Sequence, residues 1–189
     1  DCCEDNNGNI WIGTFNGLNR YQKSNGRFDV YTAGHETESL THSSIWCIVK
    51  DAQGTLWLGT YFGGVNYFNP EYEIYTRYKA SDTERDGLSS SIIGRMIEDK
   101  DGNLWICTEG GGVNVYYRKE GTFRWLRHEE GRNSISHNNV KAIYYDEKGE
   151  RMWFGTHLGG LNKLDLRTNR FTHYRMKEDD PHSLPSDII

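Results

Sequence analysis

Apolar residues recur along this chain in four short clusters of the same pattern, each centred on a tryptophan. The clusters are Ile10–Thr14, Leu56–Thr60, Leu104–Thr108 and Met152–Thr156. Each is apolar at successive positions, without the alternation of a half-exposed strand, which is typical of a strand in a sheet covered on both faces. Successive tryptophans, beginning with Trp11, are 46, 48 and 48 residues apart. The spacing predicts an internal repeat of about 47 residues.

Four strands are predicted in each repeat. An Asp-x-x-Gly turn precedes the tryptophan strand, a Gly-Leu/Val-Asn segment and then an aromatic segment follow it, and an apolar stretch such as Ile45–Val49 leads into the next Asp turn. Asp can accept a bond from its own backbone two residues on, and Gly tolerates positive φ, so this turn is a tight reversal. Small antiparallel sheets recurring at this length are typical of β-propeller blades. The prediction is an all-β propeller with four four-stranded blades, at 1–44, 45–91, 92–139 and 140–187.

Composition and charge narrow the class of protein. With 189 residues, 35% hydrophobic and 26% charged, the chain has globular composition. The net charge of −5 and the scattered Lys and Arg residues argue against nucleic-acid binding. No apolar run reaches the roughly 20 residues of a membrane span, and no direct membrane contact is expected. The cysteines, Cys2, Cys3, Cys47 and Cys107, have no metal-ligand spacing, so they are interpreted as small buried residues, and neither metal nor cofactor is expected.

The repeated motif resembles a known family. The string Leu-Trp-Leu-Gly-Thr at 56–60, followed by Gly-Gly-Val-Asn at 63–66 and preceded by Asp51-x-x-Gly54, resembles the two-component regulator propeller repeat, and so do the other three copies. Departures are Cys107 in place of glycine, a shortened turn at Asn16-Gly17, and an inserted residue before Trp153. The resemblance implies the periplasmic sensor region of a hybrid histidine kinase of the Bacteroidetes type, which binds oligosaccharides released from a polysaccharide.

The resemblance also implies more blades than the chain contains. Members of the family usually close a propeller with seven blades, so four would be a fragment. An open array of four blades exposes two apolar faces, which the remaining blades of the parent protein or a second copy of the chain would cover. The alternative is a closed four-bladed ring, completed by strands from both termini.

Loops that emerge on one rim of the propeller carry the candidate ligand-binding residues. They are the variable turns between second and third strands and the interblade loops Thr32–Ser44, Lys79–Ser91, Arg127–Asn139 and Arg175–Ser186. Trp46, Tyr61 and Phe62 suit a sugar ring, because aromatic side chains offer flat apolar platforms. Arg95 and Lys141 are predicted next to or at the position of Trp46, where they would face the channel and meet an acidic sugar or a carboxylate. The alternative is that these aromatic residues pack between blades.

Glu109 and His157 occupy equivalent positions in adjacent blades, and a carboxylate with a histidine is the minimum for general acid–base catalysis. A propeller lyase that acts on streptogramin antibiotics has distantly similar repeats. Without a nucleophile motif or a metal set, the favoured prediction is a non-catalytic sensor that binds an oligosaccharide. A protein-interaction scaffold and a lyase remain as alternatives. A scaffold would not respond to sugars, and a lyase would lose turnover on substitution of His157.

Overall fold

The computed structural model describes residues 1–34 and 39–189, and residues 35–38 of the first interblade loop lie outside the described part. Its described residues form sixteen β-strands in four separate sheets, without a helix. The predicted all-β architecture of four four-stranded antiparallel blades is therefore confirmed.

Each sheet is an antiparallel meander whose strands follow one another in chain order. Blade 1 contains β1 (Cys2–Glu4), β2 (Ile10–Thr14), β3 (Gly17–Gln22) and β4 (Arg27–Tyr31). Blade 2 contains β5 (Ile45–Lys50), β6 (Leu56–Thr60), β7 (Val65–Asn69) and β8 (Ile74–Tyr78). Blade 3 contains β9 (Ile93–Glu98), β10 (Leu104–Thr108), β11 (Gly112–Tyr117) and β12 (Thr122–Leu126). Blade 4 contains β13 (Val140–Asp146), β14 (Arg151–Thr156), β15 (Gly160–Asp165) and β16 (Arg170–Tyr174).

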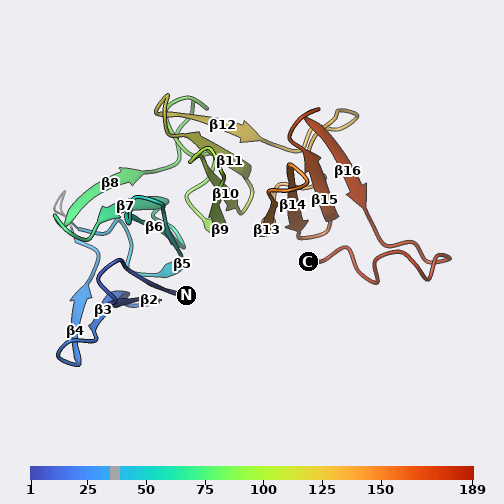
Figure 1. Cartoon of the computed structure of the whole chain (residues 1–189). Helices are drawn as coiled ribbons and strands as arrows, with labels where there is room; N and C mark the ends of the chain where they lie inside the picture. The colour runs from blue at the N-terminus through green and yellow to red at the C-terminus, as the bar shows by residue number, and fades with distance from the viewer. Residues whose placement is uncertain (35–38) are drawn as a thin grey trace.

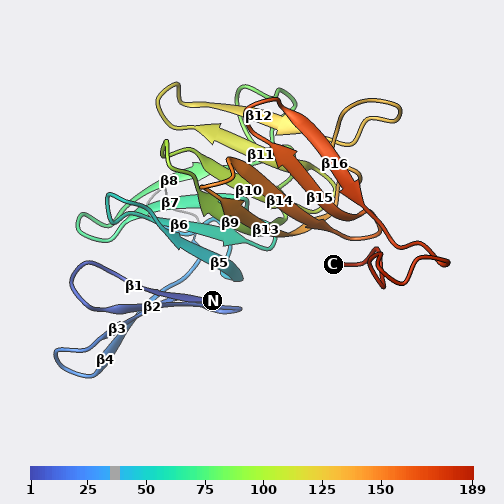
Figure 2. The same cartoon turned by 45° about the vertical axis from the view of Figure 1, so that its right-hand side comes forward.

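The four blades are arranged in an arc that stays open between blade 1 and blade 4 (Figure 1). The first strands contact one another from blade to blade, β1 with β5, β5 with β9 and β9 with β13, so they form the inner side of the arc. Figure 2 shows blades 2, 3 and 4 stacked face to face. The four-bladed ring is not formed, and the total of seven blades stays a prediction.

Three apolar cores hold the arc together, one in each space between adjacent blades. The core between blades 2 and 3, for example, joins Trp57 and Val65 to Ile93 and Ile106. A Cβ built at Gly59 would lie 2.7 Å from the Cγ2 atom of Ile93, so the glycine of Trp-x-Gly-Thr allows the next blade to approach closely. Burial of the tryptophan strands on both faces is thus explained by packing between blades.

A hydrogen bond between the turn aspartate and the tryptophan indole recurs in the first three blades. The indole N–H groups of Trp11, Trp57 and Trp105 donate to the aspartates six residues earlier, at 2.8, 3.0 and 2.9 Å. The same aspartates accept from the backbone N–H two residues on, as the sequence predicts. In blade 4 the inserted residue increases the separation to seven, and Asp146 instead accepts from the backbone of Gly149 at 2.9 Å.

A second recurring contact ties each blade to the loop that precedes it. The side chain of Asn114 accepts from the backbone N–H of Ser89 at 2.7 Å and donates to its hydroxyl at 2.8 Å. Asn66 with Thr41, and Asn162 with Ser136, repeat the arrangement. We call this contact the asparagine latch. It explains why asparagine recurs in Gly-Leu/Val-Asn, because its amide side chain accepts through the oxygen and donates through the nitrogen at the same time.

Blades 1 and 4 each have one face without a neighbouring blade. On blade 1 the uncovered face includes exposed Phe28 and Val30, and on blade 4 exposed Tyr174 stacks on half-buried Trp153, with ring centroids 5.8 Å apart.

The prediction of buried cysteines is wrong for part of blade 1, where Cys2 is exposed and Cys3 half-buried. The reason is that only Cys47 and Cys107 lie inside interblade cores.

Candidate functional site

Five aromatic side chains from blades 1 and 2 lie in a continuous row on one rim of the arc. Phe15 follows β2, Trp46 belongs to the start of β5, and Tyr61 and Phe62 follow β6. Ring centroids are 6.2 Å apart for Phe15 and Trp46, 6.0 Å for Trp46 and Tyr61, and 4.4 Å for Tyr61 and Phe62. His42 extends the row, 6.0 Å from Phe62. We call these five residues the aromatic row.

The four members of the aromatic row other than His42 are open to solvent. Phe15 is 74% exposed, Trp46 44%, Tyr61 37% and Phe62 57%. The alternative that Trp46, Tyr61 and Phe62 pack between blades is therefore wrong. Most apolar side chains of this size are buried in a folded protein, so a contiguous exposed group is a feature of interaction surfaces.

Hydrogen bonds hold the backbone beneath the row. The Nδ1 atom of His42 accepts from the backbone N–H of Ser44 at 3.0 Å, and the Ser44 hydroxyl donates to the carbonyl of Phe15 at 3.3 Å. The backbone N–H of Tyr61 donates to the carbonyl of Ser44 at 3.1 Å. Ser44 thus joins the chain segments that carry Phe15, His42 and Tyr61, and the rings are presented on a fixed backbone.

Each of the two candidate cations is paired with a carboxylate. The ammonium group of Lys141 contacts the carboxylate of Glu109, and Nη1 of Arg95 lies 3.4 Å from Oδ2 of Asp1. Both pairs are partly exposed, so each contributes little to stability. Their effect is to neutralise the two cations that the sequence predicts to face an acidic ligand.

The expected pair of Glu109 and His157 is not assembled. Glu109 faces Lys141, and among the described residues no hydrogen bond or ion pair connects it to His157. The backbone N–H of His157 donates to the carbonyl of Asn139 at 2.9 Å. Their equivalent positions in the repeat therefore do not bring these two side chains into contact.

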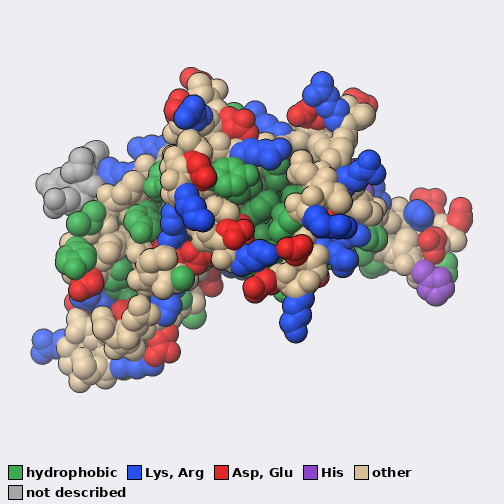
Figure 3. All heavy atoms as spheres, turned by 45° about the horizontal axis from the view of Figure 1, so that its top comes forward, with side chains coloured by type: hydrophobic (Ala, Val, Ile, Leu, Met, Phe, Trp, Pro, Cys, Tyr) green, Lys and Arg blue, Asp and Glu red, His purple; other side chains and the backbone are tan. Residues whose placement is uncertain are grey.

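Charge on the visible surface is mixed. Figure 3 shows Lys and Arg side chains interleaved with Asp and Glu on one face of the molecule. Within residues 1–34 and 39–189, no group of three or more His, Cys, Asp or Glu side chains is placed to hold a metal ion. That part of the chain also lacks a helix long and apolar enough to span a bilayer.

Sequence reasoning missed Phe15 as a member of the row. Its position directly after Trp-x-Gly-Thr is the position of Tyr61 in blade 2, and this equivalence is the feature that identifies it. It also did not select Trp125, which lines a separate pocket described below.

The repeated motif matches a known family in every blade. The family model described as "Two component regulator propeller" matches residues 1–16, 39–62, 87–110 and 134–157, one match in each blade. No curated protein sequence matches the chain.

Several solved structures share the fold. The extracellular domain of BT3049 of B. thetaiotaomicron, described as a hybrid two component system, has a TM-score of 0.79 at 20% identity over 92% of this chain. That of BT4673 from the same organism has a TM-score of 0.74 at 24% identity over 91%. The present chain spans 24% of each of those chains. Virginiamycin B lyase of Staphylococcus aureus is more distant, with a TM-score of 0.65 at 13% identity over 95% of this chain and 55% of the lyase.

The similar structures show that the chain has the propeller fold, whereas the sequence matches to the family model identify the family. Each match includes the first two strands of its blade and contains the tryptophan strand, with Trp-x-Gly-Thr in blades 1, 2 and 4 and Trp-x-Cys-Thr in blade 3. Each of the four blades therefore contains a repeat of the two component regulator propeller family.

Proposed function

We propose that the chain is part of the extracytoplasmic, non-catalytic sensor propeller of a two-component signalling protein, and that its aromatic row binds an oligosaccharide.

 The single observation that carries the proposal is the row itself, in which four aromatic side chains between 37% and 74% exposed follow one another on one rim. The C–H faces of sugar rings pack on such platforms, and successive rings of an oligosaccharide can use successive side chains. The chain has no catalytic role in this proposal, because Glu109 is occupied by Lys141 and does not meet His157.

The family of these repeats supports a signalling role. Two of the similar structures are extracellular domains of proteins described as two component systems, which favours a location outside the cytoplasm, in the periplasm or at the cell surface. The histidine kinase of such a system would lie elsewhere in the parent protein. A ligand on the rim acts on that kinase only if it binds one arrangement of the sensor more tightly than another.

The charges on the rim favour a neutral oligosaccharide. Lys141 and Arg95 are the cations that would attract an acidic sugar, and each already has a carboxylate within contact distance. An acidic ligand would have to compete with Glu109 and Asp1 for them. A neutral ligand uses the aromatic row without disturbing either pair.

The test follows the indole N–H resonances of the six tryptophans in a ¹⁵N-labelled chain during titration with neutral oligosaccharides of arabinan, galactan, mannan and xylan. We expect the Trp46 resonance, assigned with Trp46→Phe, to shift saturably with one of them. Trp46→Ala and Tyr61→Ala should each raise the Kd about tenfold, since each removes a stacking platform. Tyr72→Ala removes an exposed ring of the same size in the turn between β7 and β8, at the other end of β7 from Tyr61 and Phe62, and should leave the Kd unchanged.

The result that contradicts the proposal is a Trp46 resonance that stays in place with every glycan. If the row instead responds to a protein, the chain is an interaction scaffold. Conversion of a glycan or of a streptogramin, lost on His157→Ala, would show that it is an enzyme.

A further inference from the structure

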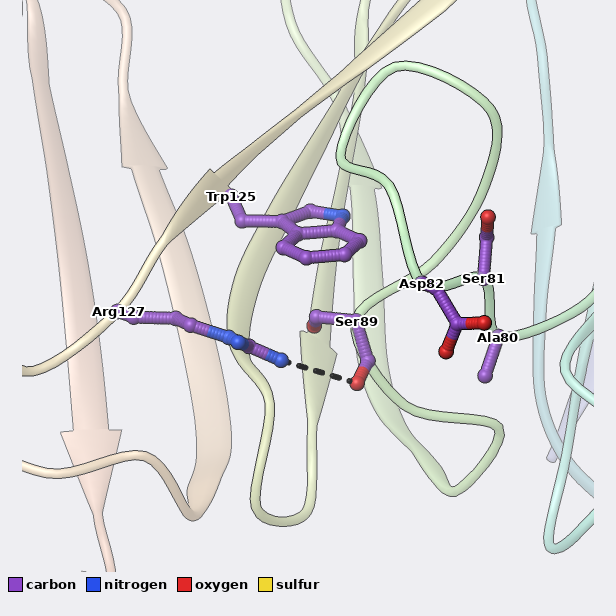
Figure 4. Close-up of a pocket in the computed structure, with 6 residues that line it drawn as sticks. All are labelled: Ala80, Ser81, Asp82, Ser89, Trp125 and Arg127. Carbon is purple, nitrogen blue, oxygen red and sulfur yellow. Dashed lines mark hydrogen bonds between the residues drawn. The ribbon is translucent and has the colours of Figure 1, made fainter.

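A cavity lies on the same rim, outside the aromatic row. It occupies about 590 Å³ between the interblade loop 79–91 and the end of β12, and is lined by Ala80, Ser81, Asp82, Ser89, Trp125 and Arg127 (Figure 4). This volume lies within the range of small-ligand sites. The aromatic row belongs to blades 1 and 2, whereas this cavity lies between blades 2 and 3, so the two regions share no residue.

Trp125 forms a fixed wall of the cavity. Its indole N–H donates to the carbonyl of Gly87 at 2.9 Å, and its backbone N–H donates to the carboxylate of Glu84. The equivalent residue of blade 4, His173, contacts the carbonyl of Ser134 at 2.8 Å through Nε2. The bond to the loop is therefore a general structural contact of the outer strand. The half-buried indole ring of Trp125 is an additional apolar surface that the contact does not require.

The opposite wall is held in place by bonds within the loop. Ser81 and Leu88 are joined by a backbone hydrogen bond of 2.9 Å, and the Leu88 N–H donates to the carbonyl of Lys79 at 3.0 Å. The backbone N–H of Ala80 donates to the Ser91 hydroxyl at 3.1 Å. Both walls are thus ordered before any ligand enters, which reduces the entropy lost on binding.

Two charged side chains complete the cavity, one of each sign. The Arg127 guanidinium lies 4.6 Å from the ring centroid of Trp125 and donates from Nη2 to the carbonyl of Ser89 at 3.3 Å. Within the described residues no ion pair uses Arg127, and the Asp82 carboxylate accepts no hydrogen bond. Figure 4 shows Asp82 across the cavity from Trp125 and Arg127. A polyhydroxylated ligand satisfies both groups, because its hydroxyls donate to the carboxylate and accept from the guanidinium.

We propose that this cavity binds one unit of a neutral saccharide, with sugar C–H groups on the exposed part of the Trp125 indole and hydroxyls between Asp82 and Arg127. The inference rests on the proposed function for the class of ligand, and it adds a second binding site to the rim. The ligand is expected to be neutral because the cavity is lined by one charge of each sign, so that the carboxylate of a uronate would be attracted by Arg127 but repelled by Asp82.

The experiment uses the same ¹⁵N indole spectra, titrated with methyl glycosides of glucose, galactose, mannose and arabinose, and with galacturonic acid. We expect the Trp125 resonance to shift with at least one neutral glycoside. Asp82→Asn and Arg127→Gln should each raise the Kd for that glycoside about tenfold, because each removes a charged hydrogen-bond partner. Arg124→Gln, on the opposite face of β12, should leave it unchanged. Trp125→His keeps a loop-bonding side chain, as in blade 4, and should abolish binding at this site without unfolding the blade.

The outcomes separate the two proposals. A Trp46 resonance that responds while Trp125 does not overturns the second site and leaves the proposed function intact. A Trp125 response that persists unchanged in Asp82→Asn and Arg127→Gln also overturns it, and tighter binding of galacturonic acid than of the neutral sugars overturns the assigned ligand class. A Trp125 response without one at Trp46 supports the second site and counts against the aromatic row.

Discussion

The indole N–H of Trp57 donates to Oδ2 of Asp51 across 3.0 Å, and the same oxygen atom lies 3.0 Å from Nη2 of Arg118 in the neighbouring blade. The side chain of Asp51 is fully buried, and the Arg118 guanidinium also lies over the Trp57 ring, 5.5 Å from its centroid. A residue of the turn in blade 2 therefore connects its own tryptophan to a cation of blade 3. A buried carboxylate is stable only with such partners.

Replacement of Asp51 should weaken the chain strongly. Asp51→Ala removes the acceptor of the Trp57 N–H and leaves Arg118 without this partner, so the free energy of unfolding should fall by about 3 kcal/mol. Urea unfolding followed by tryptophan fluorescence measures the loss. Asp101→Ala changes an exposed aspartate in a turn of blade 3 and should cost less than about 0.5 kcal/mol. Equal losses for the two variants would contradict the role assigned to Asp51.

Stability should fall in acid, in part through Asp5. Burial alone would raise the pKa of Asp5, but hydrogen bonds from the Asn9 side chain, the Trp11 indole and two backbone N–H groups outweigh it and lower the pKa below 3.8. A lowered pKa in the folded state contributes stability above pH 3.8, and this stability is lost as the pH falls further. The free energy of unfolding should therefore decrease from about pH 4 downward, and less steeply in Asp5→Asn. Denaturant titrations between pH 2 and 6 test this, and parallel curves would refute it.

The asparagine latch predicts different effects for two equivalent residues. Asn114→Ala removes both bonds to Ser89 and leaves buried polar groups without partners, so it should cost about 2 kcal/mol. In blade 1, Asn19 has only bonds of 3.4 to 3.5 Å within its own blade, and Asn19→Ala should cost less than about 1 kcal/mol. Thermal unfolding of the two variants compares them directly. The latch would lose its assigned role if Asn19→Ala proved the more damaging.

Leu158 and Gly110 provide a matched test of backbone strain. Both turn residues have left-handed φ, 75° for Leu158 and 77° for Gly110. Leucine is disfavoured in this conformation by roughly 1–2 kcal/mol. Because Leu158 is exposed and its side chain contributes little packing, Leu158→Gly should raise the melting temperature. Gly110→Leu should lower it, and a shift in the same direction for both would rule out strain as the cause.

The cysteines should differ in reactivity. Burial raises the pKa of Cys47 to about 12 and also raises that of Cys107, while the half-buried Cys3 has its pKa raised to about 11, mainly by burial. Thiolate is the reactive form, so iodoacetamide at pH 8 should modify exposed Cys2 first. Cys47 and Cys107 should react only after unfolding. Peptide mass spectrometry identifies the labelled residues, and early labelling of Cys107 would contradict the packing described for it.

The fold could be predicted from the sequence because one pattern is repeated four times. Apolar residues around Trp11 and its three counterparts, each with a turn before it, specify four strands per repeat, and the structure confirms them. The bond between Asp51 and Trp57 was not predicted, although their separation of six residues recurs in three blades. Its absence from blade 4, where one residue is inserted, shows that the separation determines it.

The candidate site was less predictable, because it depends on which residues of adjacent blades pack against one another. The hydrophobic pattern alone does not distinguish an exposed Trp46 from one between blades, since Ile45 and Cys47 on either side of it are buried. Likewise, the repeat aligns Glu109 with His157, whereas packing brings Lys141 to Glu109. The position of a residue in the repeat specifies its strand and its end of the strand. Its neighbours in the next blade depend on tertiary packing.

The asparagine latch also gives the molecule a direction of assembly. Asn114 reaches back to Ser89, which precedes its own sheet in the chain, so the connection can close only after the later residue has been synthesised. As the chain emerges N-terminus first from a ribosome or a translocation channel, each new blade would bind the loop that precedes it, and structure would grow from the N-terminus one blade at a time. The order of the repeats in the sequence would then also be the order in which the blades fold.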